Sequence, residues 1–197
     1  MRDSRRLVKG VLCGVGALSG ALGTAYVLTV RGDLTIDLGI GRRTRPLGPH
    51  RCLIAAPPEV VFDVIAAPYL GRTPSAMDSK LRVLERGADL VVAAHYTKVA
   101  CGLTATTVEA VRFERPNRVS FRVLRGPVPS VTETFELSGD GESTAFAYTG
   151  QMGTDLWGIG AWWGTRVASA WEGTVRASIS SIRVEAERRA RSRQTPH

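Results

Sequence analysis

The stretch Ile54–Pro68, IAAPPEVVFDVIAAP, contains an abrupt change of hydrophobic pattern. The residues His50–Ala55 are typical of a strand, and two prolines end it because proline cannot donate a hydrogen bond to a sheet. Proline also suits the first turn of a helix, where its missing N–H group costs nothing. Apolar residues then recur at helical spacing, at Val60, Val61, Val64 and Ile65. We therefore predict a strand that passes directly into a helix, with Pro68 ending that helix.

The middle of the chain carries repeated strand signals. Tyr69–Pro74 has room only for a short turn or helical piece. Six alternating or β-branched segments follow: Lys80–Glu85, Leu90–Val99, Thr104–Phe113, Arg118–Leu124, Val131–Leu137 and Thr144–Gln151. Short turns separate these segments, and Gly139-Asp140-Gly141 is a tight hairpin signal. This order favours an antiparallel meander over strands that alternate with helices.

The last segment changes to a helical period. From about Asp155, residues recur every three or four positions as Trp163, Val167, Ala170, Trp171, Thr174, Ser178 and Ile182. The segment becomes strongly charged after Arg183, where we expect the helix to fray. One long helix across a curved sheet would bury the concave face and leave a cavity between the two. The sequence thus predicts a domain over residues 47–193, followed by a tail over 194–197.

Three features resemble a known superfamily. They are the APPEVVFDVIA start, the V-x-F-x-V strand that follows Arg115-Pro116-Asn117-Arg118, and the Trp- and Gly-rich opening of the last helix. They resemble the START-like helix-grip (SRPBCC) superfamily, and within it the polyketide cyclase/dehydrase and lipid transport family. The resemblance implies an α+β helix-grip fold, in which a curved antiparallel sheet of about seven strands wraps on a long C-terminal helix. It also implies a pocket for a hydrophobic ligand, used for binding or transport and in some members for catalysis.

The N-terminal segment resembles a membrane anchor. Gly10–Val30 contains no charged residue, and a helix of this length spans about 31 Å, close to the hydrocarbon thickness of a bilayer. Four basic residues precede it, namely Arg2, Arg5, Arg6 and Lys9. The positive-inside rule then places the domain outside the cytoplasmic membrane. We expect an uncleaved, single-pass transmembrane helix within residues 1–31. The alternatives are a signal peptide cleaved near Gly23-Thr24-Ala25, and a soluble or peripheral segment.

Two glycine pairs in this segment have the spacing that lets membrane helices approach closely. They are Gly10/Gly14 and Gly16/Gly20, and they raise the prospect of a homodimer through the transmembrane helix. Residues 32–46 resemble a linker punctuated by Gly, Arg and Pro, with one short strand expected over Leu34–Leu38.

Composition excludes several classes of function. The formal net charge is +8, mostly from arginine, which fits either a biased codon usage or a basic surface attracted to anionic lipid. No basic stretch is interleaved with aromatic residues, so we expect no nucleic-acid partner. Cys13, Cys52 and Cys101 lack the spacing of a zinc or redox site, so no metal and no cofactor are predicted. A Cys52–Cys101 disulfide stays open if the domain is exported.

The residues offer few candidates for catalysis. No GxSxG, HExxH, P-loop or GxGxxG context is present, and His95 and Glu133 remain as candidate acid/base groups. Glu133 shares a strand face with Val131 and Phe135, and its pKa should rise if that face points inward. The alternative is a place near the cavity mouth, or pairing with Arg122 or Arg125.

Apolar residues with a few polar groups make up the expected ligand site. Its candidates are Tyr96, Phe121, Glu133, Phe135, Tyr148, Trp163, Val167 and Trp171. The leading hypothesis is a membrane-anchored domain that binds or transports a hydrophobic small molecule or lipid. The alternatives are an enzyme of polyketide cyclase/dehydrase type, and a non-catalytic interaction protein of the cell envelope whose cavity is filled by side chains.

Overall fold

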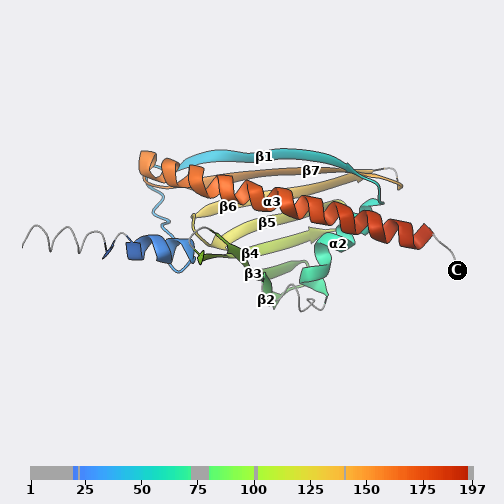
Figure 1. Ribbon diagram of the computed structural model, residues 1–197, viewed down its shortest axis with the longest axis horizontal. Coiled ribbons are helices and arrows are strands. Elements are labelled where there is room, and N and C mark those ends of the chain that lie inside the picture. Colours follow the sequence, from blue (N-terminus) through green and yellow to red (C-terminus); the bar gives the residue numbers. More distant parts are fainter. Residues whose placement is uncertain (1–19, 22, 72–79, 100–101, 140, 195–197) are drawn as a thin grey trace, which may run out of the picture.

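The structure is a computed structural model that describes residues 20–21, 23–71, 80–99, 102–139 and 141–194. Within these residues, seven strands form one antiparallel sheet in the order β1-β7-β6-β5-β4-β3-β2. The strands are β1 (Arg43–Ile54), β2 (Leu81–Arg86), β3 (Leu90–Lys98), β4 (Thr104–Glu114), β5 (Arg118–Arg125), β6 (Ser130–Gly139) and β7 (Thr144–Thr154). Helix α2 (Pro58–Leu70) follows β1, and helix α3 (Trp157–Gln194) follows β7. Figure 1 shows α3 lying along one face of the curved sheet, as the helix-grip prediction requires.

The break between the first strand and the first helix is confirmed. β1 ends at Ile54, and Pro58 is the first residue of α2. The strand begins at Arg43, however, seven residues before the predicted start. β1 is an edge strand that pairs only with β7, and edge strands are where a sheet tolerates prolines such as Pro46 and Pro49. A shift of register between Leu47 and His50, where Gly48 has a φ of +75°, carries the strand past Pro49.

Pro68 does not end α2, and that prediction was wrong. The helix continues to Leu70, and the N–H of Gly71 donates to the carbonyl of Ala67 at 3.0 Å. Proline removes one hydrogen bond from a helix, and close to the C-terminus that loss interrupts only the final turn. Tyr69 therefore stays helical, and its buried side chain packs into the core.

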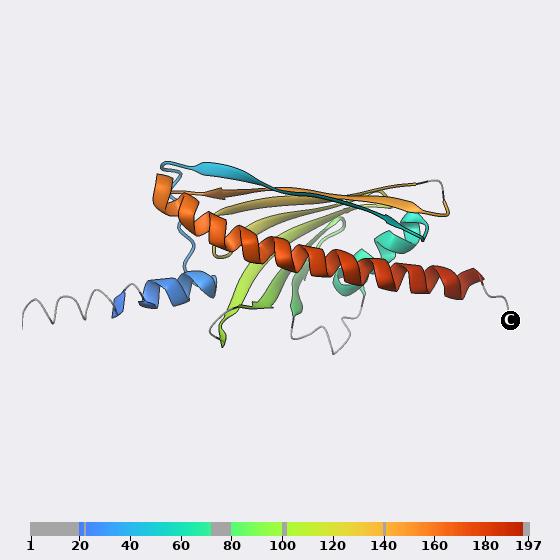
Figure 2. The ribbon, with the colours of Figure 1, turned by 45° about the horizontal axis from the view of Figure 1, so that its top comes forward.

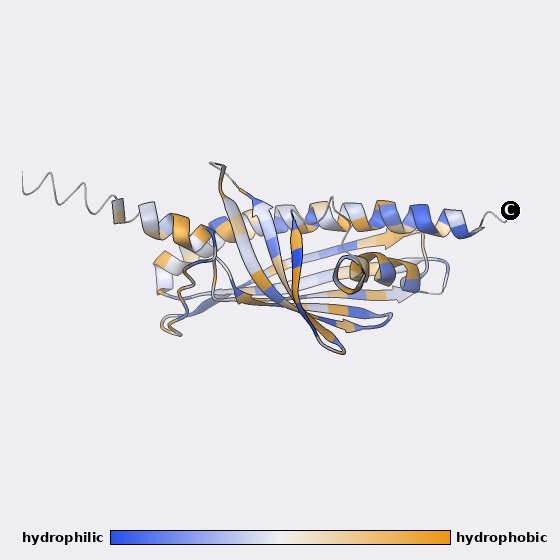
Figure 3. Ribbon diagram, turned by 90° about the horizontal axis from the view of Figure 1, so that it is seen from below, coloured by the Kyte–Doolittle hydropathy of each residue, from blue (hydrophilic) through white to orange (hydrophobic). Residues whose placement is uncertain are grey.

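The buried face of α3 overlaps the predicted one only in part: Trp163, Val167, Trp171 and Ile182 pack half-buried against the core, but the most buried side is rotated from them. The buried residues are Gly160, Gly164, Ala168, Val175, Ile179, Ala186 and Ala190, whereas Ala170, Thr174 and Ser178 are exposed. Nor does the charged end fray: the helix runs to Gln194 and contacts α2 through its second half. Ion pairs of Glu185 with Arg188 and Arg189 support this part, which is the hydrophilic half of the helix in Figure 3.

The segment before β1 packs on the domain without forming the expected strand. Residues 34–39 have no regular structure, because the N–H groups of Leu38 and Gly39 donate to the Asp155 carboxylate rather than to a strand. Residues 23–30 are helical, and the ring of Tyr26 meets that of Trp163 edge to face at 5.9 Å. The end of this helix is therefore seated beside the start of α3 (Figure 2).

Several predictions about the N-terminus and the cysteines fall outside the described residues. These predictions concern most of the proposed transmembrane segment, three of the four glycines in its two pairs, and Cys101. Among the helices that the structure describes, none is both long enough and apolar enough to cross a membrane. Cys52 lies half-buried against the core with a free thiol.

Candidate functional site

The face of the sheet that α3 covers carries an unusual buried carboxyl group. Glu133 on β6 pairs in register with Phe121 on β5, and both side chains are buried. Because side chains alternate along a strand, Val131, Phe135 and Leu137 share this inner face, as the sequence predicts. Glu133 is thus a carboxyl group among apolar and aromatic side chains.

Two hydrogen bonds hold Glu133, and both reach the same oxygen. The hydroxyl of Tyr148 on β7 donates to Oε1 at 2.5 Å, and the indole Nε1 of Trp171 on α3 donates to Oε1 at 2.6 Å. Among the described residues, no donor reaches Oε2. Gly150 leaves room for this arrangement, because a Cβ there would lie 3.2 Å from both the Glu133 side chain and the Tyr148 hydroxyl. The carboxyl group is therefore fixed in place with one oxygen still able to bind a partner.

This environment raises the pKa of Glu133 to about 7. Burial is the largest cause, since it disfavours the charged form, and the negative charge of Glu109 adds to it. The hydrogen bonds from Tyr148 and Trp171 oppose the rise because they stabilise the carboxylate. Burial and the neighbouring carboxyl also raise the pKa of Tyr148 far above its ordinary value, so its hydroxyl stays protonated as a donor.

His50 lies beside this group on β1. Its ring stacks on that of Tyr148, with centroids 5.6 Å apart and planes 11° apart, as their pairing in register allows. Its Nε2 atom is buried and has no hydrogen-bond partner among the described residues. Gly48, next to it, faces the Tyr148 ring so closely that a Cβ would lie 3.0 Å from a ring carbon. His50, Tyr148, Glu133 and Trp171 therefore form a continuous polar row, which we call the Glu133 cluster.

A second polar cluster lies on the same inner face, towards the other edge of the sheet. Glu109 on β4 is 4% exposed, and the hydroxyl of Thr107 donates to its Oε1 at 2.7 Å. His95 on β3 places Nε2 3.8 Å from Glu109 Oε2 and 3.4 Å from the hydroxyl oxygen of Tyr69 on α2. Burial, together with the charges of Glu109 and Glu133, raises the pKa of Tyr69 well above its ordinary value.

The inner face is sealed at one end and slightly open near the clusters. Phe62, Phe146 and Ile54, around α2 and the hairpin end of the sheet, are 0–2% exposed. By contrast, Phe121, Glu133 and Phe135 on the sheet and Val175 on α3 each keep 8% exposure. Water-sized space therefore reaches the apolar side chains that surround Glu133. An apolar surface with a few fixed polar groups has the usual composition of a small-molecule site.

The structure brings together most of the predicted ligand-site residues, but not all. Phe121, Glu133, Phe135, Tyr148 and Trp171 lie together on the inner face. Val167 is half-buried against the core, and Trp163 donates to the Pro127 carbonyl at 2.7 Å, at the edge of the site. Tyr96 alternates with His95 on β3, so it lies on the opposite face of the sheet. Arg122 and Arg125 are exposed, and Glu133 pairs with neither.

Sequence reasoning misses several polar residues of the inner face. Thr107 and Glu109 lie on the same face of the strand predicted over Thr104–Phe113. Assigning that face to the inside of the sheet would have found both residues. Tyr69 escapes notice because Pro68 predicts an earlier end of the helix. His50 is missed because the pattern makes it the first residue of the strand, whereas β1 starts at Arg43 and places it inside the strand. The contact between Trp171 and Glu133 joins residues 38 positions apart, which no local pattern reveals.

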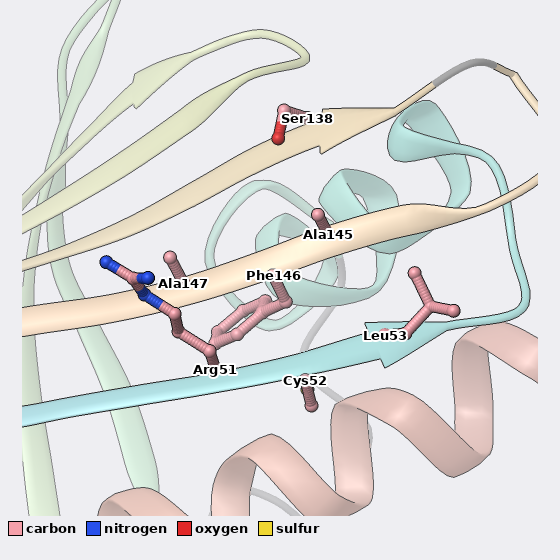
Figure 4. A pocket seen from close by; sticks show the side chains of 7 residues that line it. All are labelled: Arg51, Cys52, Leu53, Ser138, Ala145, Phe146 and Ala147. Carbon is pink, nitrogen blue, oxygen red and sulfur yellow. The ribbon is translucent and has the colours of Figure 1, made fainter.

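A shallow hollow lies elsewhere, on the opposite face of the sheet. It has a volume of about 480 Å³ and is lined by Arg51, Cys52, Leu53, Ser138, Ala145, Phe146 and Ala147 (Figure 4). Arg51 is its ionisable group besides the Cys52 thiol, and it does not include the Glu133 cluster. Within the described part of the chain, no group of His, Cys, Asp and Glu side chains is arranged to hold a metal ion.

Comparison with solved structures supports the fold. The Zhui aromatase/cyclase from Streptomyces sp. R1128 is 21% identical, with a TM-score of 0.63 over 75% of this chain and 96% of that chain. A protein from Thermus thermophilus is 19% identical, with a TM-score of 0.51 over 77% of this chain and all of that chain. A Rhizobium loti protein is 17% identical, with a TM-score of 0.51 over 73% and 98%. Identities this low establish the shared fold only.

A search among curated proteins finds no match to the sequence. A family model, in contrast, matches residues 50–187, which is more than half of the chain and contains β1 from His50 through most of α3. This match confirms the family that the sequence motifs indicate. The chain belongs to the polyketide cyclase / dehydrase and lipid transport family.

Proposed function

We propose that this domain binds a hydrophobic small molecule or lipid between the inner face of the sheet and α3, with Glu133 as its polar anchor. One observation carries the proposal: Tyr148 and Trp171 hold Oε1 of Glu133, while Oε2 has no donor among the described residues. A pKa of about 7 lets the carboxyl group accept a hydrogen bond from a ligand or donate one at neutral pH. Aromatic side chains around it supply apolar contact area.

A second candidate function is acid/base catalysis of the polyketide cyclase/dehydrase type. The observation that favours it is the pKa of Glu133, because a general acid or base works best when its pKa lies near the working pH. The similar fold of a protein named as an aromatase/cyclase supports this alternative at the level of analogy. His95 and Glu109 offer a second titratable pair on the same face.

Native mass spectrometry of the full chain, purified in mild detergent, tests the binding proposal through a retained ligand. Glu133→Gln separates the two functions, because the amide keeps an acceptor oxygen but cannot transfer a proton. A binding domain should keep most of its affinity for a neutral ligand, whereas an enzyme should bind but lose its turnover. Glu136→Gln is the matched control, since Glu136 lies on the outer face of the same strand and pairs with Arg118. The interaction-protein alternative instead requires that no small molecule binds at all.

We further propose that the segment over residues 10–30 anchors the domain in a membrane. Its support is the uncharged sequence, of which the part before Tyr26 is free to enter the bilayer while Tyr26 and Val30 pack on the domain. Extraction of a membrane fraction with alkaline carbonate checks this proposal. The full chain should stay in the pellet, and recovery of an intact N-terminus in the soluble fraction would refute the anchor.

The same proposal places the domain outside the cytoplasmic membrane. Four basic residues precede the apolar segment, and positively charged flanks favour the cytoplasm. A protease that cannot cross membranes should digest the domain in intact, wall-stripped cells. Digestion only after lysis would reverse the orientation.

A further inference from the structure

Large apolar side chains are exposed at the start of α3 and in the segment beside it. Trp157 is 57% exposed, Ile159 74% and Trp162 58%, while Leu38 and Ile40 are 58% and 52% exposed. We call these five residues the α3-start patch. A soluble surface rarely gathers tryptophan and isoleucine side chains in this way unless it contacts a partner or a membrane.

The patch is held together by hydrogen bonds rather than by chance proximity of two chain segments. The N–H of Leu156 donates to the Ile40 carbonyl at 2.8 Å, and the N–H of Trp157 donates to the Gly41 carbonyl at 3.0 Å. Asp155 is buried, and it accepts from the Leu38 N–H at 2.6 Å and from Arg42 Nε at 2.7 Å. The exposed apolar side chains are therefore displayed on a fixed backbone.

Two exposed arginines accompany this patch. The Arg166 guanidinium lies 4.7 Å from the centroid of the Trp162 ring, in a cation–π contact. Arg43 is exposed next to the Leu38–Arg42 turn. Within the described residues, neither Arg43 nor Arg166 has a carboxylate partner, unlike Arg42 and Arg31, which pair with Asp155 and Asp33. Tryptophan beside unpaired arginine is the composition that favours the headgroup region of an anionic membrane.

The position of the N-terminal helix supports the same occupant. Tyr26 meets Trp163, and Val30 is buried, so the apolar segment enters the domain beside the start of α3. If that segment enters a bilayer, this end of the domain must face the lipid headgroups. Figure 3 shows the opposite, hydrophilic end of α3 at the far side of the domain.

We infer that the α3-start patch docks on the surface of an anionic lipid bilayer. This inference rests on the membrane anchoring proposed above and adds a second contact, which fixes the orientation of the domain on the membrane. Trp157, Ile159 and Trp162 enter the headgroup region, and Arg43 and Arg166 meet lipid phosphates. The long axis of α3 then leads away from the membrane.

Quenching of tryptophan emission by lipids with brominated acyl chains tests this contact. The full chain is reconstituted in vesicles that contain phosphatidylglycerol, and flotation first verifies that it is bound. The amount of emission lost to the brominated lipid should be smaller in Trp157→Phe/Trp162→Phe than in the wild type, by roughly twofold or more. The reason is that exposed interfacial tryptophans lie within reach of the bromine. Trp171→Phe is the matched control, since Trp171 bonds Glu133 inside the domain. It should leave the amount of emission lost to the brominated lipid unchanged.

The charged part of the contact has its own control. Arg43→Gln/Arg166→Gln should lessen the quenching in phosphatidylglycerol vesicles and leave neutral vesicles little changed, because surface attraction needs opposite charge. Arg51→Gln/Arg122→Gln removes two exposed arginines of the outer sheet face and should have no such effect.

The outcomes separate this inference from the anchor. A bound chain whose quenching is the same in wild type and in the double tryptophan variant overturns the patch and leaves the anchor standing. A chain that does not float overturns both. A dimer that hides these tryptophans from bromine, and that dissociates in the double variant, assigns the surface to a second copy and also overturns the inference.

Discussion

Tyr148 donates its hydroxyl hydrogen to Glu133 across the β6–β7 pair, with the two oxygens 2.5 Å apart. The contact lies inside the sheet–helix interface, and Trp171 from α3 donates to the same oxygen. One carboxyl oxygen thus links two strands and the covering helix. The charge state of Glu133 is therefore coupled to the packing of α3 on the sheet.

Removal of the Tyr148 donor should raise the pKa of Glu133 further. The hydrogen bond stabilises the carboxylate and opposes the effect of burial, so Tyr148→Phe should move the midpoint above about 7. Infrared titration of the carboxyl carbonyl band measures this midpoint. Tyr96→Phe is the control, because Tyr96 lies on the other face of the sheet. An equal or lower midpoint in Tyr148→Phe would show that the hydroxyl does not act on this carboxyl group.

Glu133 should make the domain less stable as the pH rises. Its pKa is about 7 in the folded chain and 4.5 as the ordinary value of an unfolded chain, so the folded state holds more protons between these values. The stability that it contributes is complete below pH 4.5 and is lost as the pH rises through 7, a total of about 3 kcal/mol. Burial causes most of this shift and Glu109 adds to it, whereas the hydrogen bonds from Tyr148 and Trp171 oppose it.

Thermal unfolding of Glu133→Gln in mild detergent, from pH 4.5 to 8, measures this dependence. The variant should lack most of the decline and should melt above the wild type at pH 8, because the amide carries no charge to bury. Glu136→Gln should retain the decline, since Glu136 is exposed. A decline of the same size in wild type and Glu133→Gln would place its origin in other groups.

Asp155 should act in the opposite direction, at acidic pH. Arg42 and the N–H groups of Gly39 and Leu38 lower its pKa to about 2. Its stabilising effect is therefore present above pH 3.8 and is lost as the pH falls through 2. Asp155→Asn should lower the melting temperature at pH 7, and the difference from wild type should shrink towards pH 2. Asp89→Asn is the control, because Asp89 is exposed and pairs with Arg112. A difference that does not depend on pH would mean that the charge of Asp155 is not what stabilises the turn.

The local patterns of the sequence predict the order of elements well. Proline at 57 and 58 marks the step from strand to helix, and alternation around Phe135 places Glu133 on the inner face. The same patterns fail where small residues make the buried and exposed sides of a helix nearly equal in hydrophobicity. Ala168 is fully buried and Ala170 is exposed, yet their side chains are identical, so the rotation of α3 follows from packing alone.

The polar part of the site depends even more on long-range contacts. The donors to Glu133 come from β7 and α3, and the pairing of these elements with β6 sets their positions. His50 reaches Tyr148 because β1 pairs with β7 at the edge of the sheet, although the two strands are the first and last in the chain. A sequence can indicate which face points inward, but not which polar groups meet there.

Occupation of the space around Glu133 is the central claim, and binding by a space-filled variant tests it most directly. Val175 is buried on α3 one turn after Trp171, which bonds Glu133, so Val175→Phe should weaken binding of a hydrophobic ligand about tenfold or more, with overpacking costing roughly 1–3 kcal/mol of stability. Ala170→Phe adds the same ring on the exposed side of α3 and should bind like wild type. The measurement is isothermal titration of the full chain with neutral long-chain alcohols, sterols and polycyclic phenols. The account predicts at least one ligand that binds wild type and Ala170→Phe equally and Val175→Phe more weakly. Equal affinity in all three proteins, or no binding to any of them, would contradict it.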